Sequence, residues 1–170
     1  AHAISRITAN VTHKIDDNNH IYLSAYSSKD RFTLDNDTAY SYSDRNASLK
    51  WKHLFNNKLY GVLTAGFSNY SYAIDSDQNP VEAFTMDFNI RQLQAKADFS
   101  FFPNSRHTLS AGLSTIRYDL SPGSRQPVGG ESLIVRDVVD NEQGLEGALY
   151  ISENFEVSAK LSLYVGLRYS

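Results

Sequence analysis

The side chains in this sequence with the most potential for chemistry are five histidines, at positions 2, 13, 20, 53 and 107. Each stands alone near an expected turn or strand end. The sequence has no HExxH motif and no closely spaced histidine pair with carboxylates. Zinc sites in proteins draw their ligands from clusters of that kind. We therefore expect no metal centre on these histidines, which are better suited to turns and interfaces.

Carboxylates occur in three pairs: Asp16 with Asp17, Asp35 with Asp37, and Asp75 with Asp77. Oxygen ligands of this kind suit Ca²⁺, but a calcium loop of the EF-hand type also needs a glycine and a distal glutamate. The stretch that begins at Asp75 has neither at the required spacing. We interpret the three pairs as solvated turn residues.

A nucleophilic serine would need a histidine beside it. Ser110 and His107 lie on one expected strand at opposite parity, so their side chains point to opposite faces. Gly129 and Gly130 are not followed by the Lys-Ser or Lys-Thr of a phosphate-binding loop. We expect this protein not to be an enzyme and to use no cofactor.

Tyrosine is abundant, with eleven residues in the chain. Tyr40 and Tyr42 lie in an expected loop, and Tyr70 and Tyr72 lie near the end of an expected strand; aromatic faces of this kind stack on sugars and other ligands. We regard these four as candidate extracellular ligand-binding residues. A girdle at a membrane interface together with loop packing explains the same pattern, and both interpretations remain open.

The composition limits the class of partner. A net charge of −3 over 170 residues excludes a strongly basic nucleic-acid-binding protein, and the absence of cysteine excludes disulfides and thiolate sites. The sequence contains no run of about 18 apolar residues, so it does not suggest a transmembrane helix. The sequence opens in a strand-like pattern without a signal peptide, as a mature or trimmed product would.

Alternation with a period of two residues predicts that the candidate residues are positioned by β-strands. It is clearest in the last strand, where every second residue is apolar: Leu161, Leu163, Val165, Leu167 and Tyr169. We expect eight strands in four hairpins, at residues 3–15, 20–34, 45–56, 58–74, 83–102, 106–118, 143–152 and 160–170.

Two strands have irregular patterns. In 58–74 apolar residues occur at both odd-numbered and even-numbered positions, so the pattern does not decide which face of the strand is apolar. In 83–102 the apolar parity changes at Arg91 and Gln92, which predicts a β-bulge there. Residues 133–139 have the composition of a further short strand.

Connections alternate between short turns, at 16–19, 56–57 and 103–105, and long loops, at 35–44, 75–82 and 121–142. Strands in soluble domains usually have about five or six residues, and several here are expected to be twice as long. Outer-membrane barrels combine long strands with short periplasmic turns and long extracellular loops. The sequence therefore predicts an all-β fold, an antiparallel up-and-down transmembrane β-barrel in the outer membrane of a Gram-negative bacterium. A soluble ligand-binding β-barrel, with its faces exchanged, is an alternative.

The two faces of the predicted wall differ in chemistry. Charged residues that lie opposite the apolar stripes are predicted to face the lumen: Arg6, Lys14, Lys50, Lys52, Lys96, Asp98 and Arg168. Aromatic residues that gather at strand ends are predicted to form interfacial girdles: Trp51, Phe55, Phe101, Phe102, Tyr118 and Tyr169.

Several stretches occur in an order that is typical of one family. They are Asn19-His-Ile-Tyr-Leu-Ser-Ala-Tyr, Lys29-Asp-Arg-Phe32, Asn46-Ala-Ser-Leu-Lys-Trp-Lys-His-Leu-Phe-Asn-Asn-Lys-Leu59, Asn69-Tyr-Ser-Tyr72, Tyr118-Asp-Leu-Ser-Pro-Gly123, Ala148-Leu-Tyr-Ile-Ser-Glu-Asn-Phe and Lys160-Leu-Ser-Leu-Tyr-Val-Gly-Leu-Arg-Tyr-Ser170. Together they resemble the barrel of TonB-dependent outer-membrane receptors. The resemblance is to the Bacteroidetes type, which carries a carboxypeptidase-regulatory-like domain before its plug.

The resemblance implies a barrel of about 22 strands around a plug. Residues 1–170 would then be one partial domain, a central slice of the barrel, with the plug and the remaining strands outside it. The implied function is TonB-driven uptake of a bulky nutrient such as an iron chelate, cobalamin, a glycan or a peptide. A self-contained eight-stranded structural or adhesive barrel is the alternative.

The implied partners follow from that setting. They are outer-membrane lipid and lipopolysaccharide, the remainder of the barrel and the plug, and TonB through segments outside this sequence. A surface lipoprotein is a further candidate partner. Nucleic acid is not expected.

Overall fold

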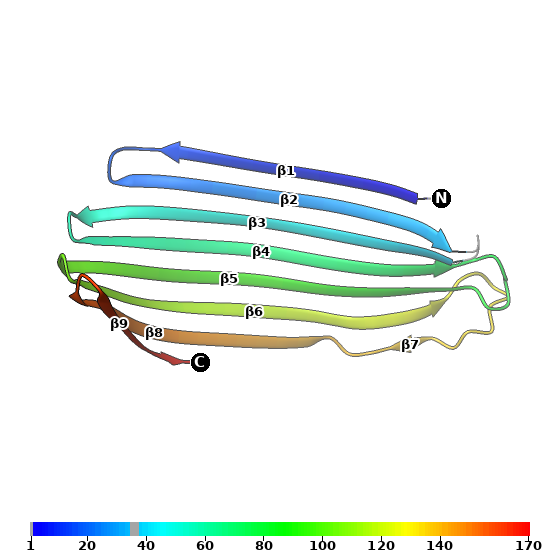
Figure 1. The fold of residues 1–170 in the computed structure, drawn as a ribbon. Helices are drawn as coiled ribbons and strands as arrows, with labels where there is room; N and C mark the ends of the chain where they lie inside the picture. The colour runs from blue at the N-terminus through cyan, green and yellow to red at the C-terminus, as the bar shows by residue number, and fades with distance from the viewer. Residues whose placement is uncertain (1, 35–37) are drawn as a thin grey trace.

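The computed structural model describes residues 2–34 and 38–170 and folds them into one nine-stranded antiparallel sheet (Figure 1). The strands are β1 (His2–Lys14), β2 (Asn19–Leu34), β3 (Thr38–Asn56), β4 (Leu59–Ser76), β5 (Phe84–Asn104), β6 (His107–Pro127), β7 (Asp137–Val138), β8 (Glu142–Ser158) and β9 (Leu161–Tyr169). In this part of the chain no helix is long and apolar enough to cross a membrane.

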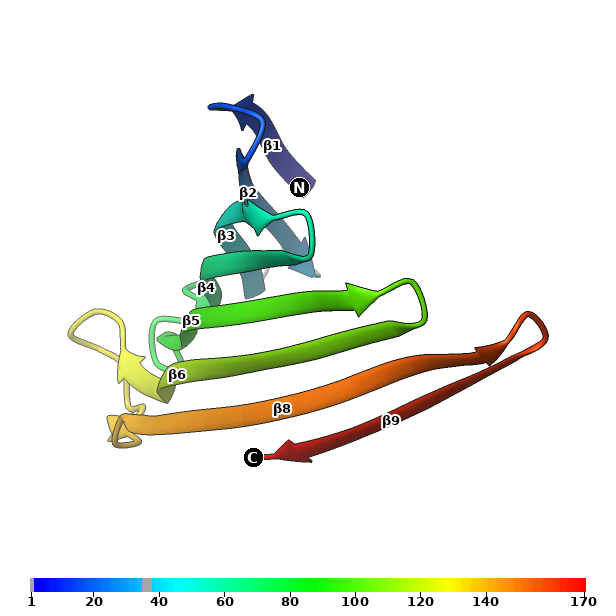
Figure 2. The same ribbon diagram turned by 90° about the vertical axis from the view of Figure 1, so that its left-hand side faces the viewer.

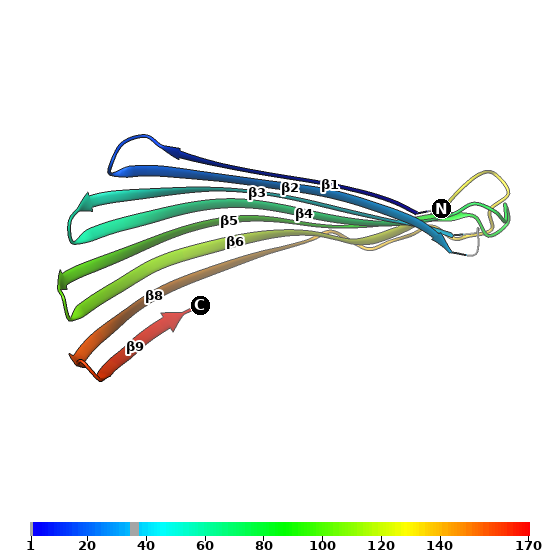
Figure 3. The same cartoon turned by 45° about the horizontal axis from the view of Figure 1, so that its top comes forward.

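The strands follow an up-and-down order, β1-β2-β3-β4-β5-β6-β8-β9, with the two-residue β7 paired to β6. The predicted all-β antiparallel fold is confirmed, and β7 lies inside the stretch 133–139 that was expected to form a short strand. Figures 2 and 3 show a single curved and twisted layer, with β1 and β9 at opposite edges. In the described residues each of these two edge strands pairs with one neighbour, so the sheet is open.

The strands are longer than the sequence pattern predicts. The expected loop 35–44 is strand from Thr38 onward, with 35–37 outside the described residues, and β6 continues into the expected loop 121–142 as far as Pro127. Both β5 and β6 have 21 residues, a length of about 70 Å at roughly 3.3 Å per residue. Because about 9–11 tilted residues span the hydrocarbon of a membrane, these strands extend well beyond it at the loop end.

The β-bulge predicted at Arg91 and Gln92 is wrong. Strands β4 and β5 stay in register without interruption through both residues. The irregularity lies instead on β6, where Pro122 and Gly123 together stand opposite Phe88. Gly123 has a φ of +130°, a conformation that residues with a Cβ rarely adopt.

The apparent change of parity has a different cause. Across the sheet, odd-numbered residues pair with odd-numbered ones, so each parity forms one face. In the turn half of β5 the apolar residues are odd, as in Leu93 and Ala95, whereas in the loop half they are even, as in Phe88 and Ile90. The apolar surface therefore passes from one face of the wall to the other between Ile90 and Leu93, and β5 stays regular through the change. The apolar residues at both parities in β4 have the same explanation.

The odd-numbered face of the turn half is an apolar belt. Its central rows join Ile21, Trp51, Leu63, Ala97, Leu113 and Leu149 in one line and Leu23, Leu49, Ala65 and Ala95 in the next. These side chains lack a core to pack against: the buried apolar residues among those described are Ala39, Ala83 and Ala148. Leu49 is 47% exposed and Leu149 is 59% exposed. A continuous apolar surface of this size needs an apolar environment, and a lipid bilayer supplies one.

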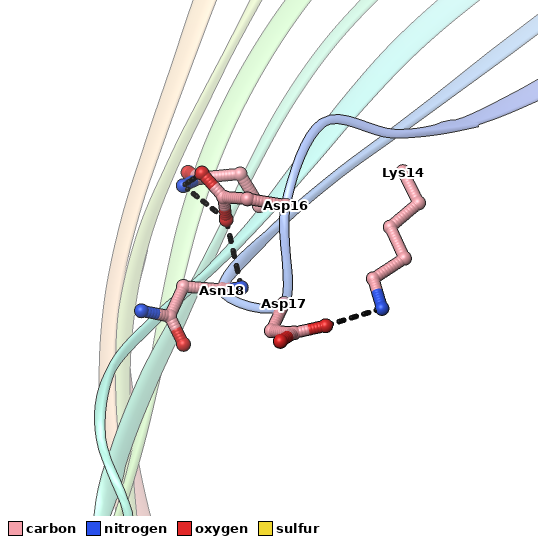
Figure 4. A network of polar contacts seen from close by, with 5 residues as sticks. Lys14, Asp16, Asp17 and Asn18 are labelled. Carbon is pink, nitrogen blue, oxygen red and sulfur yellow. Dashed lines mark hydrogen bonds and ion pairs between the residues drawn. The ribbon is translucent and has the colours of Figure 1, made fainter.

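The turn between β1 and β2 is organised by two carboxylates (Figure 4). Asp16 accepts hydrogen bonds from the backbone N–H of Asn18 at 2.8 Å and from Nδ2 of Asn19 at 2.9 Å, and Asp17 forms an ion pair with Lys14. The Asn19 side chain and the Asn18 backbone lower the pKa of Asp16, and Lys14 lowers the pKa of Asp17. The stabilisation from both contacts is therefore present above the ordinary value of 3.8 and is lost as pH falls through the lower folded values.

We expect carboxyl chemical shifts, followed by NMR during an acid titration, to give midpoints below 3.8 for Asp16 and Asp17. In the Asn19→Ala variant the midpoint of Asp16 should move up toward 3.8, because its first hydrogen-bond donor is gone. Asp17 serves as the internal control and should move less, because its main partner, Lys14, is unchanged. Midpoints at or above 3.8 in the parent protein would contradict the hydrogen-bonded turn.

Candidate functional site

The loop half of the even-numbered face carries a group of aromatic rings from β2, β3 and β4. We call Phe32, Tyr40, Tyr42 and Tyr72 the tyrosine stack. Ring centroids lie 5.2 Å apart for Phe32 and Tyr40, 5.9 Å for Phe32 and Tyr42, 4.8 Å for Tyr42 and Tyr72, and 6.5 Å for Tyr40 and Tyr72. Three of the four candidate ligand residues thus meet in one cluster, and the fourth, Tyr70, lies one row nearer the membrane.

The rings of the tyrosine stack are nearly parallel, with interplanar angles of 14–29°. Neighbouring rings therefore cover each other's faces, which restricts the surface left for stacking on a ligand. Burial raises the pKa of Tyr72, with Tyr42 adding to the effect, and burial followed by Tyr42 and Asp44 raises the pKa of Tyr70. These hydroxyls stay protonated at neutral pH and act as hydrogen-bond donors and acceptors, not as phenolate ligands.

Carboxylates accompany the tyrosines on the same face. Asp30 is in register with Tyr42, and Asp44 is in register with Tyr70. Asp44 also accepts a hydrogen bond of 3.0 Å from Nδ2 of Asn46. The arrangement places hydroxyl groups next to carboxylates above the membrane-spanning rows, a combination suited to a polar ligand that carries many hydroxyl or amide groups.

Below this mouth, the even-numbered face carries two neighbouring rows that we call the lumen ladder. One row joins Lys52, Val62, Asp98, Gly112, Tyr150 and Arg168, and the other joins Lys50, Thr64 and Lys96. Nζ of Lys96 lies 3.0 Å from Oδ1 of Asp98, and the Tyr150 hydroxyl donates a hydrogen bond to the same oxygen.

The lumen ladder brings together five of the seven charged residues predicted to line the lumen, namely Lys50, Lys52, Lys96, Asp98 and Arg168. Of the other two, Arg6 lies apart, in the row of Asp44 and Tyr70. Lys14 begins the Lys52 row at its β1 end. Because one carboxylate faces several cations, this part of the wall is positively charged and favours an anionic surface or ligand opposite it.

Glycine 112 shows how closely the ladder is packed. A Cβ added to Gly112 would lie 2.4 Å from Cε1 of Tyr150 and 2.8 Å from the backbone oxygen of Ala97. The ring of Tyr150 therefore reaches Asp98 across a position that has no side chain. Tyr150 had no distinguishing signal in the sequence, because its pairing with Gly112 depends on the register between β6 and β8.

We expect Gly112→Ala to lower the free energy of unfolding by about 1–3 kcal/mol, because the methyl group overpacks a site closed by backbone. Denaturant unfolding of the detergent-folded protein measures the change. The control is Gly147→Ala, since a Cβ there meets no atom within 4 Å. Equal stability of the two variants would show that Tyr150 does not depend on the space above Gly112.

The predicted girdle residues divide between the two faces. Trp51 lies on the belt side and donates a hydrogen bond of 3.1 Å from Nε1 to Oδ1 of Asn19. Tyr118 lies on the lumen side, where its hydroxyl contacts Glu146 at 3.1 Å, and Phe102 packs 5.9 Å from the Tyr60 ring. An outward girdle position for Tyr118 and Phe102 is therefore wrong.

The histidines occupy turns and strand ends. His107 contacts Oε1 of Glu153 through Nδ1 at 2.6 Å and stacks on Phe155. His53 contacts Oδ1 of Asn19 at 2.7 Å. Across residues 2–34 and 38–170, no three side chains of the metal-ligating types converge.

Comparison with known proteins identifies solved structures that share this fold. No protein-family model matches this sequence, and no curated protein matches it. Among solved structures, BauA, the ferric preacinetobactin receptor from Acinetobacter baumannii, is similar over 98% of this chain and 33% of its own, with 11% identity and a TM-score of 0.75. The translocator domain of the autotransporter NalP from Neisseria meningitidis is similar over 98% of this chain and 59% of its own, with 12% identity and a TM-score of 0.57.

Both similar structures are outer-membrane β-barrel proteins, so the fold of this chain is that of an outer-membrane barrel wall. The chain spans about a third of the length of the first and about three fifths of the second.

Proposed function

We propose that this chain forms part of the wall of a TonB-dependent transporter, in the outer membrane of a Gram-negative bacterium, that takes up a bulky nutrient. The observation that carries the proposal is the division of one sheet into three surfaces: the apolar belt outside, the charged lumen ladder inside, and the tyrosine stack with its carboxylates at the mouth. The higher TM-score to a ferric siderophore receptor than to an autotransporter translocator, over the same 98% of the chain, supports it.

Each surface has a part in the proposed transport. The positively charged ladder would contact a plug that carries acidic groups on its outer surface. The mouth, with its tyrosine hydroxyls and Asp30 and Asp44, would bind a hydroxyl-rich or amide-rich nutrient such as an iron chelate, cobalamin, a glycan or a peptide. The wall would support binding and passage, with no catalytic step.

The rest of the assembly belongs to the same proposal. Residues 1–170 would be a central slice of a barrel of about 22 strands of the Bacteroidetes type. Further strands would pair with the open edges of β1 and β9, and a plug would fill the lumen. TonB would couple through segments outside this chain, and a surface lipoprotein would cover the mouth.

Uptake in cells tests the function. We expect cells that carry the gene to accumulate a nutrient that cells with the gene deleted do not, in a screen of ferric siderophores, cobalamin, oligosaccharides and peptides. Loss of TonB, or a protonophore, should abolish that accumulation. Uptake that continues without TonB, or export of a protein segment to the cell surface, would contradict the proposal.

A further inference from the structure

A band of cations lies on the outward face of the wall directly above the apolar belt. The row that follows Ala47 and Phe67 toward the loops joins Ser27, Arg45, Asn69, Arg91 and Asp119, and the next row joins Lys29, Ser43, Ser71, Asn89 and Ser121. Both rows have the parity of the belt and therefore face away from the lumen. In the outer-membrane setting of the proposed function, this height corresponds to the lipid headgroups just above the hydrocarbon that the apolar belt contacts.

The centre of this band is a hydrogen-bonded polar network. Nδ2 of Asn89 donates to Oδ1 of Asn69 at 3.0 Å and to Oγ of Ser71 at 2.8 Å, and Nδ2 of Asn69 lies 3.2 Å from the same Oγ. All three side chains are half-buried, so their positions are fixed by the sheet. Asn69 lies between the two arginines of its row, and Ser71 and Asn89 present their hydroxyl and amide groups in the next row, which also carries Lys29.

The cations around the network are exposed and lack anionic partners. Arg45 and Arg91 flank Asn69, and Lys29 lies one row further out; within the described residues none of these three side chains has a hydrogen bond or an ion pair. Two other cations on this face are paired, Arg117 with Asp119 at 3.3 Å and Arg31 with Asp75 at 3.9 Å. Asp119 is in register with Arg91 but is held by Arg117, and Asp87 lies a row above Asn89.

We propose that Lys29, Arg45, Asn69, Ser71, Asn89 and Arg91, here called the headgroup patch, bind the phosphorylated sugar headgroup of an outer-leaflet glycolipid of the lipopolysaccharide type. Three exposed cations complement its phosphates, and the amide and hydroxyl network complements its sugar hydroxyls. The acyl chains of the same molecule lie along the apolar belt below. The inference rests on the outer-membrane setting of the proposed function and does not depend on transport.

The test uses protein extracted from outer membranes and exchanged into detergent, with diphosphoryl lipid A in mixed micelles as the probe. The test variant is Lys29→Gln, Arg45→Gln and Arg91→Gln together. The matched control removes the same charge from the lumen ladder through Lys50→Gln, Lys52→Gln and Lys96→Gln. Since each cation near an anionic lipid surface contributes roughly a fivefold effect, we expect the test variant to bind lipid A at least tenfold more weakly and the control to bind as the parent does.

Two further probes identify the source of the phosphate. Lipid A freed of its phosphates should bind the parent at least tenfold more weakly, and inorganic phosphate at the same concentration should leave its thermal midpoint unchanged. The inference is overturned if the test variant binds as the parent does, if the control loses as much affinity, or if inorganic phosphate alone gives the same shift. Retained affinity for an acidic protein surface, with none for lipid A, would also overturn it. Circular dichroism measures whether both variants keep the β-sheet content of the parent protein.

Discussion

Replacing Leu49 by arginine should lower the free energy of unfolding by about 2–4 kcal/mol when the protein is folded in a bilayer. Leu49 lies in the middle of the apolar belt, between Leu23 and Ala65, and points away from the lumen. A guanidinium group there would face hydrocarbon, where no group of the wall hydrogen-bonds it. Equilibrium unfolding in phospholipid vesicles measures the effect.

The control is Ser48→Arg, one residue away on the opposite face. Its neighbours across the sheet, Ser24 and Gly66, are small and uncharged, and the side chain would lie on the face opposite the apolar belt, away from lipid. We expect a change in stability that is small compared with that of Leu49→Arg. If the two variants were equally stable, the odd-numbered face would not be the one that meets lipid.

A second large effect is expected at the mouth. Replacing Tyr72 by alanine removes a ring that packs against two others, at 4.8 Å from Tyr42 and 6.5 Å from Tyr40. Central aromatic residues of a binding surface typically contribute about 2 kcal/mol or more, so we expect roughly a thirtyfold rise in Kd for the transported nutrient. Binding to the purified protein by isothermal titration measures it.

The companion variant Tyr72→Phe keeps the ring and removes the hydroxyl group. It separates packing from hydrogen bonding, since only the alanine variant opens the stack. A control at Tyr164, which is exposed on the edge strand β9, should leave the Kd unchanged when replaced by alanine. An equal loss of affinity in Tyr72→Ala and Tyr164→Ala would show that the tyrosine stack is not part of the binding site.

Much of this architecture was predictable from the sequence, because a barrel wall is one layer thick. With no core to bury, the parity of each strand is read directly as lipid side or lumen side, and Lys50, Lys52 and Asp98 could be assigned to a common face. The strand order was predictable for the same reason, since short turns such as 56–57 pair each strand with the one before it.

Other features depend on the position along the strand, between its turn end and its loop end, and the alternation of apolar and polar residues gives no information about that position. The switch at Arg91 resembles a bulge because a local rule takes the apolar side to be the same throughout a strand. The pairings of Phe32 with Tyr40 and of Tyr150 with Gly112 depend on the exact register between neighbouring strands, which the alternation within each strand does not give. The number of strands in the complete barrel, the bacterial group and the nutrient remain predictions.

The up-and-down order of the sheet has a consequence for how such proteins change in evolution. With the two-residue β7 set aside, each strand between the two edges bonds to the strand before and the strand after it, so the wall is built of successive hairpins. Deleting one hairpin would bring its two flanking strands together as a new antiparallel pair and leave the remaining pairs of strands unchanged. Chains of very different lengths can therefore share this wall, as the receptor and the translocator domain do, and barrel circumference can change in steps of two strands.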